Sequence, residues 1–298
     1  MRRYVIAFFA AGAATAAQCQ LIISSTSTGS GLARAVYYDL GAGTTTTLWS
    51  SGSNNSGYGI VADDNVGKLY YVTGARLGSA GYGPAPLTAA AIAGLYFPDN
   101  ATVANAWDLA EANGNLYTWT HGSGTSFTRG IYQAPTLPNA QNHLVLSPLW
   151  LDSPTTGNQY AFQGLTYRPA DGLFYGVNMI TDHALGLYSI DAFGSGAVTY
   201  LAPMPSGHTH VDGLTFDATG TTAYMTEQNP TDQKIYIFSL GLASLTYGST
   251  YAFSYTDATQ RGTGVTWSPN VFTPVPEPAT IGGLFAGVAL LLSRTRKR

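Results

Sequence analysis

One short phrase recurs five times along this 298-residue chain, and its spacing limits the fold to a few architectures. Each copy starts with Gly or Ala, continues with an apolar–polar alternation and reaches a turn; in four copies a second segment follows, rich in Leu or Tyr in most of them. The fifth copy stops after its first half. A repeat roughly 50 residues long indicates one structural unit used several times. The copies begin at Gly59, Ala106, Gly164, Gly213 and Gly264.

Each copy predicts a β-hairpin, because alternating segments flank a turn built from Asp, Asn and Gly. Second hairpins follow: one spans 186–201, and similar ones begin at 130–132 and 234–238. Two hairpins per repeat make a four-stranded blade, and radial repetition of blades makes a β-propeller. The alternative is an open or sandwich-like all-β domain.

The two ends of the repeat region predict ring closure. The last half-copy supplies one inner strand at 262–268, while an N-terminal hairpin, 33–39 and 44–49, lacks an inner partner. Joining them completes a blade and covers edges that otherwise invite aggregation. We therefore expect an all-β propeller of about five four-stranded blades over 31–272, or six blades if 74–104 holds a further copy.

Period-two alternation assigns faces to the inner strands. One aligned set is expected to pack between blades: Ile60, Trp107, Leu165, Leu214 and Val265. The intervening set is mostly small and polar and suits the opposite face: Val61, Asp108, Thr166, Thr215 and Thr266. The aligned tyrosines of the second strands are expected in the interblade core: Tyr70, Tyr117, Tyr175 and Tyr224.

Composition excludes two classes of protein. Only 10% of residues are charged, against roughly 25% in a typical domain, so the chain is not a charged disordered polymer. The net charge of −3, with scattered Arg, excludes the basic face that a nucleic-acid partner needs. Cys19 is the only cysteine, so neither an intramolecular disulfide nor a cysteine metal site is possible.

The N-terminus predicts a secretion signal over 1–17. Arg2 and Arg3 form a positive start, and the apolar stretch from Tyr4 to Ala17 is too short for a stable membrane anchor. This segment is expected to be a signal helix. A Ser/Thr/Gly-rich linker is expected over 18–30.

The C-terminal 273–298 has three parts in order. Val-Pro-Glu-Pro occupies 275–278, an apolar run predicts a hydrophobic helix over 281–292, and a basic end occupies 294–298. Twelve apolar residues cover about 18 Å as a helix, short of the ~30 Å hydrocarbon core. The tail is therefore either a transient anchor awaiting a processing enzyme or an ordinary tail anchor.

This order of motif, apolar run and basic end resembles the PEP-CTERM sorting signal of Gram-negative bacteria. The resemblance covers 275–298 and implies that an exosortase recognises Pro276, Glu277 and Pro278. It further implies export through the inner membrane, transient membrane anchoring through the C-terminal helix, and a place at the cell surface or in the extracellular matrix. It links the protein to exopolysaccharide and biofilm, with polysaccharide or surface proteins as partners.

Candidate binding residues precede the Gly or Ala of each repeat, where inner strands enter the central channel. Such a ring can bind a sugar or a cation, or it can simply be solvated. The expected members are Tyr58, Asn105, Gln163, Asp212 and Thr263.

His208, His210 and Asp212 suggest one divalent metal ion. On an extended strand these residues share a face, so their side chains can converge on zinc or a similar ion. The alternative is a chance pair of histidines in a Gly/Pro-rich loop. The sequence indicates no other cofactor, since it holds neither a P-loop nor a dinucleotide fingerprint.

Weak catalytic candidates are the acids near the inner strands, Asp108, Asp212 and Glu227, because glycoside cleavage uses paired carboxylates. No Gly-x-Ser-x-Gly elbow is present. The leading hypothesis is therefore a binding or structural module rather than an enzyme. The alternative is a secreted propeller hydrolase or lyase that acts on polysaccharide, with metal assistance.

Overall fold

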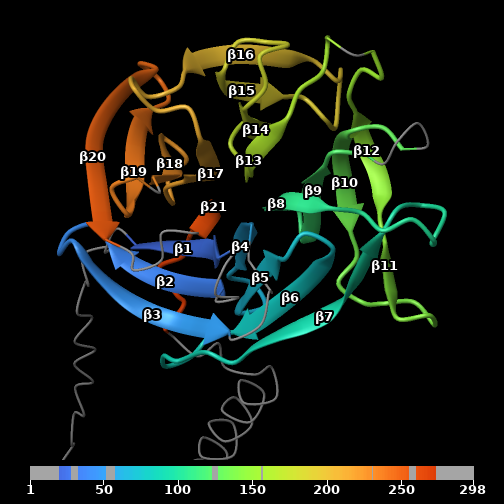
Figure 1. Ribbon diagram of the computed structural model, residues 1–298, viewed down its shortest axis with the longest axis horizontal. Coiled ribbons are helices and arrows are strands. Elements are labelled where there is room, and N and C mark those ends of the chain that lie inside the picture. Colours follow the sequence, from blue (N-terminus) through green and yellow to red (C-terminus); the bar gives the residue numbers. More distant parts are fainter. Residues whose placement is uncertain are drawn as a thin grey trace, which may run out of the picture.

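The computed structural model describes residues 20–27, 33–51, 58–122, 127–155, 157–229, 231–254 and 260–272. All regular secondary structure in these ranges is β, in five sheets arranged around a common axis (Figure 1). Within the same ranges no helix offers the length and apolarity needed to span a bilayer. The expected signal helix (1–17), the PEP motif (276–278) and the apolar helix (281–292) lie outside the described residues.

Each sheet is a blade, whose strands run in order from the axis outward. Blade 1 contains β21 (Gln260–Trp267), β1 (Gln20–Ser27), β2 (Ala33–Asp39) and β3 (Thr44–Ser51). Blade 2 contains β4 (Gly59–Asp63), β5 (Lys68–Val72), β6 (Arg76–Gly81), β7 (Ala89–Tyr96) and β11 (His143–Val145). Blade 3 contains β8 (Ala106–Ala112), β9 (Asn115–Thr120), β10 (Gly130–Ala134) and β12 (Ser147–Leu151). Blade 4 contains β13 (Phe162–Arg168), β14 (Leu173–Asn178), β15 (Gly186–Ile190) and β16 (Val198–Pro203), and blade 5 contains β17 (Val211–Phe216), β18 (Thr222–Asn229), β19 (Lys234–Gly241) and β20 (Thr246–Ser254).

The predicted five-bladed propeller with a composite closing blade is confirmed. The C-terminal β21 forms the inner strand of blade 1, and the N-terminal hairpin β2–β3 lies outside it. The inner strands contact one another in chain order, and β21 contacts β4 to complete the ring. Residues 74–104 hold no sixth blade, because they supply β6 and β7 of blade 2.

The expectation of a linker over 18–30 is wrong for 20–27, where β1 pairs with both β21 and β2. Leu21, Ile22 and Ile23 are at most 1% exposed. Leu21 and Ile23 pack toward blade 5, while Ile22 packs toward blade 2. A strand buried on both faces shows no alternation, so its short apolar run carried no period-two signal among the surrounding Ser and Thr.

Five hydrophobic clusters fill the five gaps between neighbouring blades. The cluster between blades 2 and 3 unites Tyr70 with Leu109, and that between blades 4 and 5 unites Tyr175 with Leu214. The predicted core role of the four aligned tyrosines is confirmed, since each is at most 8% exposed. Burying one large apolar side chain stabilises the fold by about 1.5–3 kcal/mol, so the interblade clusters dominate its stability.

Glycines allow the five inner strands to approach at the axis. A Cβ on Gly59 would lie 2.4 Å from the Cα of Asp108, and a Cβ on Gly264 would lie 2.8 Å from the Cα of Gly59. Gly164 and Gly213 occupy the same position in blades 4 and 5. Gly164 pairs with Val177 and Gly213 with Thr226, in each case two residues after the aligned tyrosine of the second strand. In blade 3 the residue at this position is Asp108, which pairs with Trp119, and its side chain lies against Gly59.

Blade 3 therefore differs by two residues from the sequence alignment. Leu109, not Trp107, takes the interblade position of Leu165 and Leu214, and Trp107 is only half-buried. The expected place of Asp108 among the small polar residues is likewise wrong, because Ala110 pairs with Tyr117 as Thr166 pairs with Tyr175. The cause is the turn between β8 and β9, which is two residues shorter than its counterpart in blade 4: Ala112 pairs with Asn115 across a two-residue loop, whereas Arg168 pairs with Leu173 across four residues.

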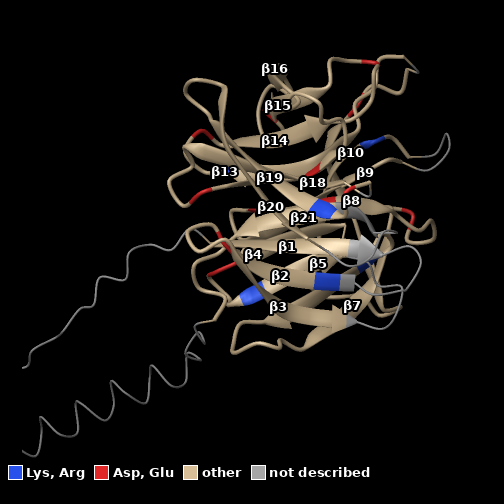
Figure 2. Cartoon of the chain, turned by 60° about the vertical axis from the view of Figure 1, so that its left-hand side comes forward, with Lys and Arg blue, Asp and Glu red and all other residues tan. Residues whose placement is uncertain are grey.

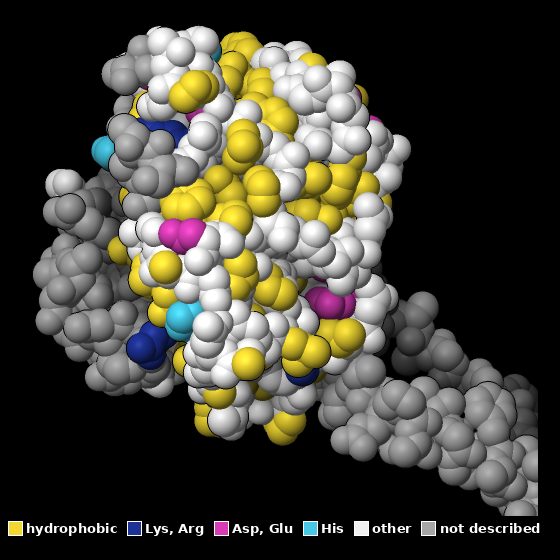
Figure 3. Space-filling model, turned by 90° about the vertical axis from the view of Figure 1, so that its right-hand side faces the viewer, with side chains coloured by type: hydrophobic (Ala, Val, Ile, Leu, Met, Phe, Trp, Pro, Cys, Tyr) yellow, Lys and Arg dark blue, Asp and Glu magenta, His cyan; other side chains and the backbone are white. Residues whose placement is uncertain are grey.

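The described surface carries few charges. Figure 2 shows isolated Lys and Arg rather than a basic face, with acids mainly in turns. Figure 3, which faces the right-hand side of Figure 1, shows many hydrophobic side chains and few charged ones on that face. A surface of this kind offers stacking and hydrogen bonding more than charge attraction.

Candidate functional site

The inner strands begin at one opening of the ring, which we call the start mouth, and end at the other, the end mouth. At the start mouth three successive inner strands carry a β-bulge at the same position. The ladder skips Trp107 in β8, Gln163 in β13 and Asp212 in β17. A bulge leaves one residue unpaired and redirects its side chain, and bulges are over-represented beside functional sites. Trp107, Gln163 and Asp212, all half-buried, form what we call the bulge arc.

Tyr58 and Thr263 extend the bulge arc on the other two inner strands, directly before Gly59 and Gly264. The ring of Tyr58 lies 5.8 Å from that of Trp107, at an interplanar angle of 30°. Thr263 is fully buried, and its hydroxyl pairs with that of Thr226 at 2.9 Å. Four of the five residues predicted for the ring thus occupy equivalent positions.

Asn105 is the exception, because the shorter β8–β9 turn shifts the pairing by two residues and places Trp107 at its expected position. Asn105 precedes β8 and is exposed. It lies beside Gly74, near the ring of Tyr58. The site therefore holds a second aromatic residue where the sequence alignment predicted an amide.

Two carboxyl groups and an imidazole meet beside the bulge arc. Glu227 of β18 is 6% exposed, and its Oε2 contacts His208 Nδ1. Its Oε1 accepts a hydrogen bond from the backbone N–H of His210 at 3.3 Å. Asp212 lies close enough for the charge of Glu227 to act on it: burial first, and Glu227 second, raise the pKa of Asp212 to about 8. At neutral pH the Asp212 carboxyl is mostly protonated and can donate a hydrogen bond.

Asp108 lies deeper and serves the scaffold. It is 1% exposed, and its carboxyl accepts the backbone N–H groups of Leu109 at 2.8 Å and Leu165 at 2.6 Å. Burial raises its pKa well above the usual range, the two backbone bonds oppose that shift, and the charge of Asp212 adds to it. The structure thus brings Asp108, Asp212 and Glu227 into one electrostatic cluster, with Asp108 joining blades 3 and 4.

The expected convergence of His208, His210 and Asp212 on a metal ion does not occur. Strand β17 begins only at Val211, so the strand periodicity does not extend to the histidines, and Asp212 stands in a bulge. The side chain of His208 turns to Glu227, while His210 is exposed. Among the described residues no group of three His, Cys, Asp or Glu side chains is placed to hold a metal.

A histidine that sequence reasoning missed lies behind Trp107. The His121 ring is 4.4 Å from that of Trp107, and burial, followed by the charge of Arg129, lowers its pKa to about 4. Its buried Nε2 has no hydrogen-bond partner in the described structure. His121 is thus a neutral aromatic support for Trp107. Its position directly after β9, beside the start of β8, was the available signal.

Comparisons with known proteins show a shared fold. No protein-family model and no curated protein matches the chain. A chain of the nidogen/laminin complex aligns with a TM-score of 0.50 and 13% identity, covering 83% of this chain and 99% of that one. TolB from Acinetobacter baumannii aligns at 0.44 and 14%, covering 80% of this chain and 53% of its own length. The periplasmic gluconolactonase PpgL from Pseudomonas aeruginosa aligns at 0.39 and 15%, covering 80% and 69%. Identities this low say nothing about ligand or activity.

Proposed function

We propose that this protein is an exported surface or matrix protein whose propeller binds polysaccharide at the start mouth. The observation that carries the proposal is the bulge arc. Three successive blades redirect Trp107, Gln163 and Asp212 at one opening. These strands could pair without a bulge. The recurrence of a bulge at the same position in three blades therefore supports a functional role for the three side chains that it redirects.

The chemistry of the bulge arc suits sugars. Trp107 and Tyr58 supply ring faces 5.8 Å apart, and aromatic faces bury the apolar side of a sugar ring while their polar edges stay wet. Gln163 offers both a donor and an acceptor, and the protonated Asp212 carboxyl does the same. Hydroxyl groups of a polysaccharide need this mixture. A neutral or weakly charged polymer fits a mouth that holds no cation of its own among these residues.

The tail supports the cellular part of the proposal. The PEP motif at 276–278, the apolar run at 281–292 and the basic end at 294–298 occur in the order of an exosortase substrate. We infer export through the inner membrane of a Gram-negative cell, transient anchoring by the tail, and processing by an exosortase. The placement next to exopolysaccharide then agrees with the ligand proposed for the start mouth.

Equilibrium binding tests the ligand. The full chain is titrated with matrix polysaccharide from the producing cells, and Trp107→Ala and Gln163→Ala are each compared with a matched control. Loss of a stacked sugar contact, worth about 1–2 kcal/mol, weakens binding roughly fivefold to thirtyfold in Trp107→Ala. Trp150→Ala on the outer strand β12 and Gln133→Ala on β10 leave affinity unchanged. Equal affinity of Trp107→Ala and wild type contradicts the proposal.

The raised pKa of Asp212 favours a second candidate, a hydrolase or lyase acting on the same polymer. A carboxyl that holds its proton near pH 7 can act as general acid, with Glu227 as the neighbouring carboxylate. Turnover of polysaccharide that disappears in Asp212→Asn while binding persists establishes this candidate. Parallel assays with and without a chelator decide whether a metal assists. Absence of turnover with intact binding leaves the binding module.

A further inference from the structure

The end mouth contains a pocket that the proposed function does not use. Its volume is about 400 Å³, within the range of small-molecule sites, and the last residues of all five inner strands line it. Thr166, Thr215 and Thr266 face it from three blades, as their place opposite the interblade face predicts. Its aromatic lining residues are Tyr167, Phe216 and Trp267.

The pocket is rich in hydrogen-bond donors that lack an acceptor. Thr266 Oγ1 accepts the N–H of Ala62 at 3.0 Å, and Thr215 Oγ1 accepts the N–H of Trp267 at 3.2 Å. Both threonines are at most 6% exposed, and their hydroxyl hydrogens find no acceptor among the described residues. The buried indole N–H of Trp267 is also unpaired there. Leaving a buried donor unpaired costs about 1–3 kcal/mol, so an acceptor in the pocket is favoured.

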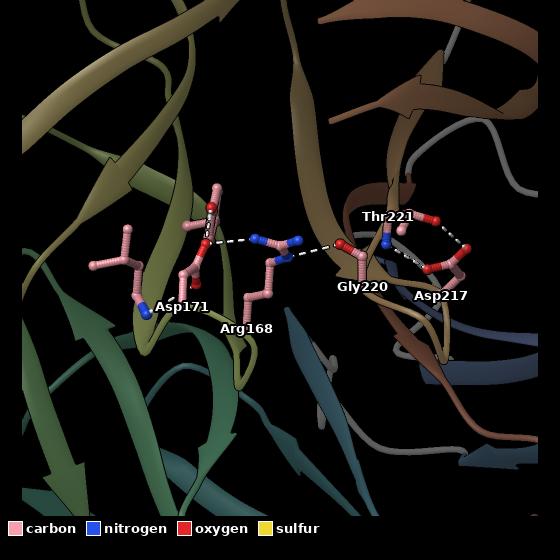
Figure 4. A network of polar contacts seen from close by, with 7 residues as sticks. Arg168, Asp171, Asp217, Gly220 and Thr221 are labelled. Atoms are coloured by element: carbon pink, nitrogen blue, oxygen red, sulfur yellow. Dashed lines mark hydrogen bonds and ion pairs between the residues drawn. The ribbon is translucent and has the colours of Figure 1, made fainter. Parts of the chain in front are cut away.

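Arg168 supplies the positive charge among the lining residues. Its Nη1 contacts Asp171 Oδ2 at 2.6 Å, and its Nε donates to the carbonyl of Gly220 at 2.7 Å (Figure 4). Asp171 is held in turn by the hydroxyl of Tyr175 at 2.7 Å. These contacts fix the guanidinium between blades 4 and 5. Its Nη2 has no hydrogen bond to the described residues and is free for an anionic oxygen.

Each of the two acids that line the pocket accepts a backbone N–H group from its own turn. Asp217 Oδ1 accepts the N–H of Thr221 at 2.9 Å within its own turn. Glu111 accepts the N–H of Gly114 at 2.6 Å. Burial, followed by the charge of Asp63, raises the pKa of Glu111. Glu111 also lines the pocket, where its carboxyl group can accept a hydroxyl group of a ligand.

We propose that the end-mouth pocket binds one acidic monosaccharide unit, a hexuronate. Its carboxylate pairs with Arg168, its hydroxyl and ring oxygens accept from Thr215, Thr266 and Trp267, and the aromatic lining covers its apolar face. The hydrogen-bond donors without acceptors favour a ligand rich in oxygen, and the Arg168 guanidinium favours a ligand that carries a negative charge. This site does not rest on polysaccharide binding at the start mouth, because it uses other residues at the opposite opening.

Calorimetric titration of the full chain with glucuronate, and with glucose as the uncharged comparison, tests the proposal. Glucuronate binds saturably and glucose at least tenfold more weakly, since a charge-assisted hydrogen bond is worth about 1.5–3 kcal/mol. Arg168→Gln removes that difference, while Arg76→Gln, at an exposed arginine of β6, keeps it. Equal affinity for the two sugars, no binding of glucuronate by wild type, or glucuronate binding that is unchanged in Arg168→Gln overturns the proposal.

Two milder variants cover the case in which Arg168→Gln fails to fold. Thr166→Val removes a hydroxyl that makes no hydrogen bond in the described structure and weakens glucuronate binding roughly threefold to tenfold, whereas Thr250→Val on the exposed β20 has no effect. Trp267→Phe keeps an aromatic ring beside Tyr224 but loses the unpaired N–H, and it weakens glucuronate binding. Trp150→Phe loses an N–H that donates to Gly196 at 3.0 Å, far from the pocket, and it leaves glucuronate binding unchanged. Unchanged affinity in both Thr166→Val and Trp267→Phe overturns the proposal.

Discussion

Replacing Asp212 by Asn should remove a pH dependence from the stability of the propeller. The pKa of Asp212 is raised to about 8 by burial and by Glu227, against about 3.9 in an unfolded chain. The folded state therefore binds a proton that the unfolded state has released between these two pH values. The stability that this proton contributes is complete below pH ~4 and is lost as pH rises through about 8.

The size of the effect follows from the same shift. Four pKa units correspond to about 5–6 kcal/mol as an upper limit. Asp212 is half-buried, so screening by solvent reduces the expected loss to about 2–3 kcal/mol between pH 5 and pH 8.5. Asp108 has a raised pKa as well and contributes a slope of the same sign. The quantity to measure is thus the difference between wild type and Asp212→Asn in how the free energy of unfolding changes with pH.

Urea unfolding at pH 5 and pH 8.5 provides that difference. Wild type should lose about 2–3 kcal/mol more than Asp212→Asn over this interval. Asp191→Asn is the matched control, because Asp191 lies in a turn where hydrogen bonds from Ser195 lower its pKa. It should retain the wild-type loss above pH 5. Parallel pH profiles of wild type and Asp212→Asn refute the raised pKa and with it the proton donor at the start mouth.

Three further outcomes are expected. Gly59→Ala should prevent folding or lower the melting temperature sharply, since its Cβ would lie 2.4 Å from the Cα of Asp108. The control Gly81→Ala, whose Cβ would meet no atom within 4 Å, should leave the melting temperature unchanged. Equal melting temperatures of the two variants would contradict the close approach of the inner strands at the axis. Asp108→Ala should cost about 2–5 kcal/mol of unfolding free energy, because two buried backbone N–H groups lose their acceptor, and a loss under ~1 kcal/mol speaks against that role. Deleting 275–298 should move the protein from the cell surface to the medium in fractionation; unchanged retention and processed mass would count against sorting by the tail.

The repeat predicted most of the fold because each copy carries its own hairpin signal. Turn residues and alternating strands are local features, and a half-copy at the C-terminus could only be completed by strands from the N-terminus. Strand β1 was missed, since Leu21 to Ile23 are buried on both faces and give no alternation. Strand β11 was missed as well: its parallel pairing with β7 connects residues that are distant in sequence.

The candidate site was only partly predictable for a related reason. The β8–β9 turn is two residues shorter than the β13–β14 turn, and no local pattern marks the difference, so the sequence aligned Asn105 with Gln163 where the structure has Trp107. The proximity of Asp212 to Glu227 depends on register between β17 and β18, which the repeat did fix. The contact of His208 with Glu227 depends on a loop, and no periodicity describes a loop.

A crystal structure of the protein with an oligosaccharide from its own matrix tests the proposed binding site most directly. Sugar density should lie at the start mouth, with a ring against Trp107 and hydroxyl groups within hydrogen-bond distance of Gln163 and Asp212. Sugar bound elsewhere on the propeller, with an empty bulge arc, would contradict the assignment of polysaccharide binding to this mouth.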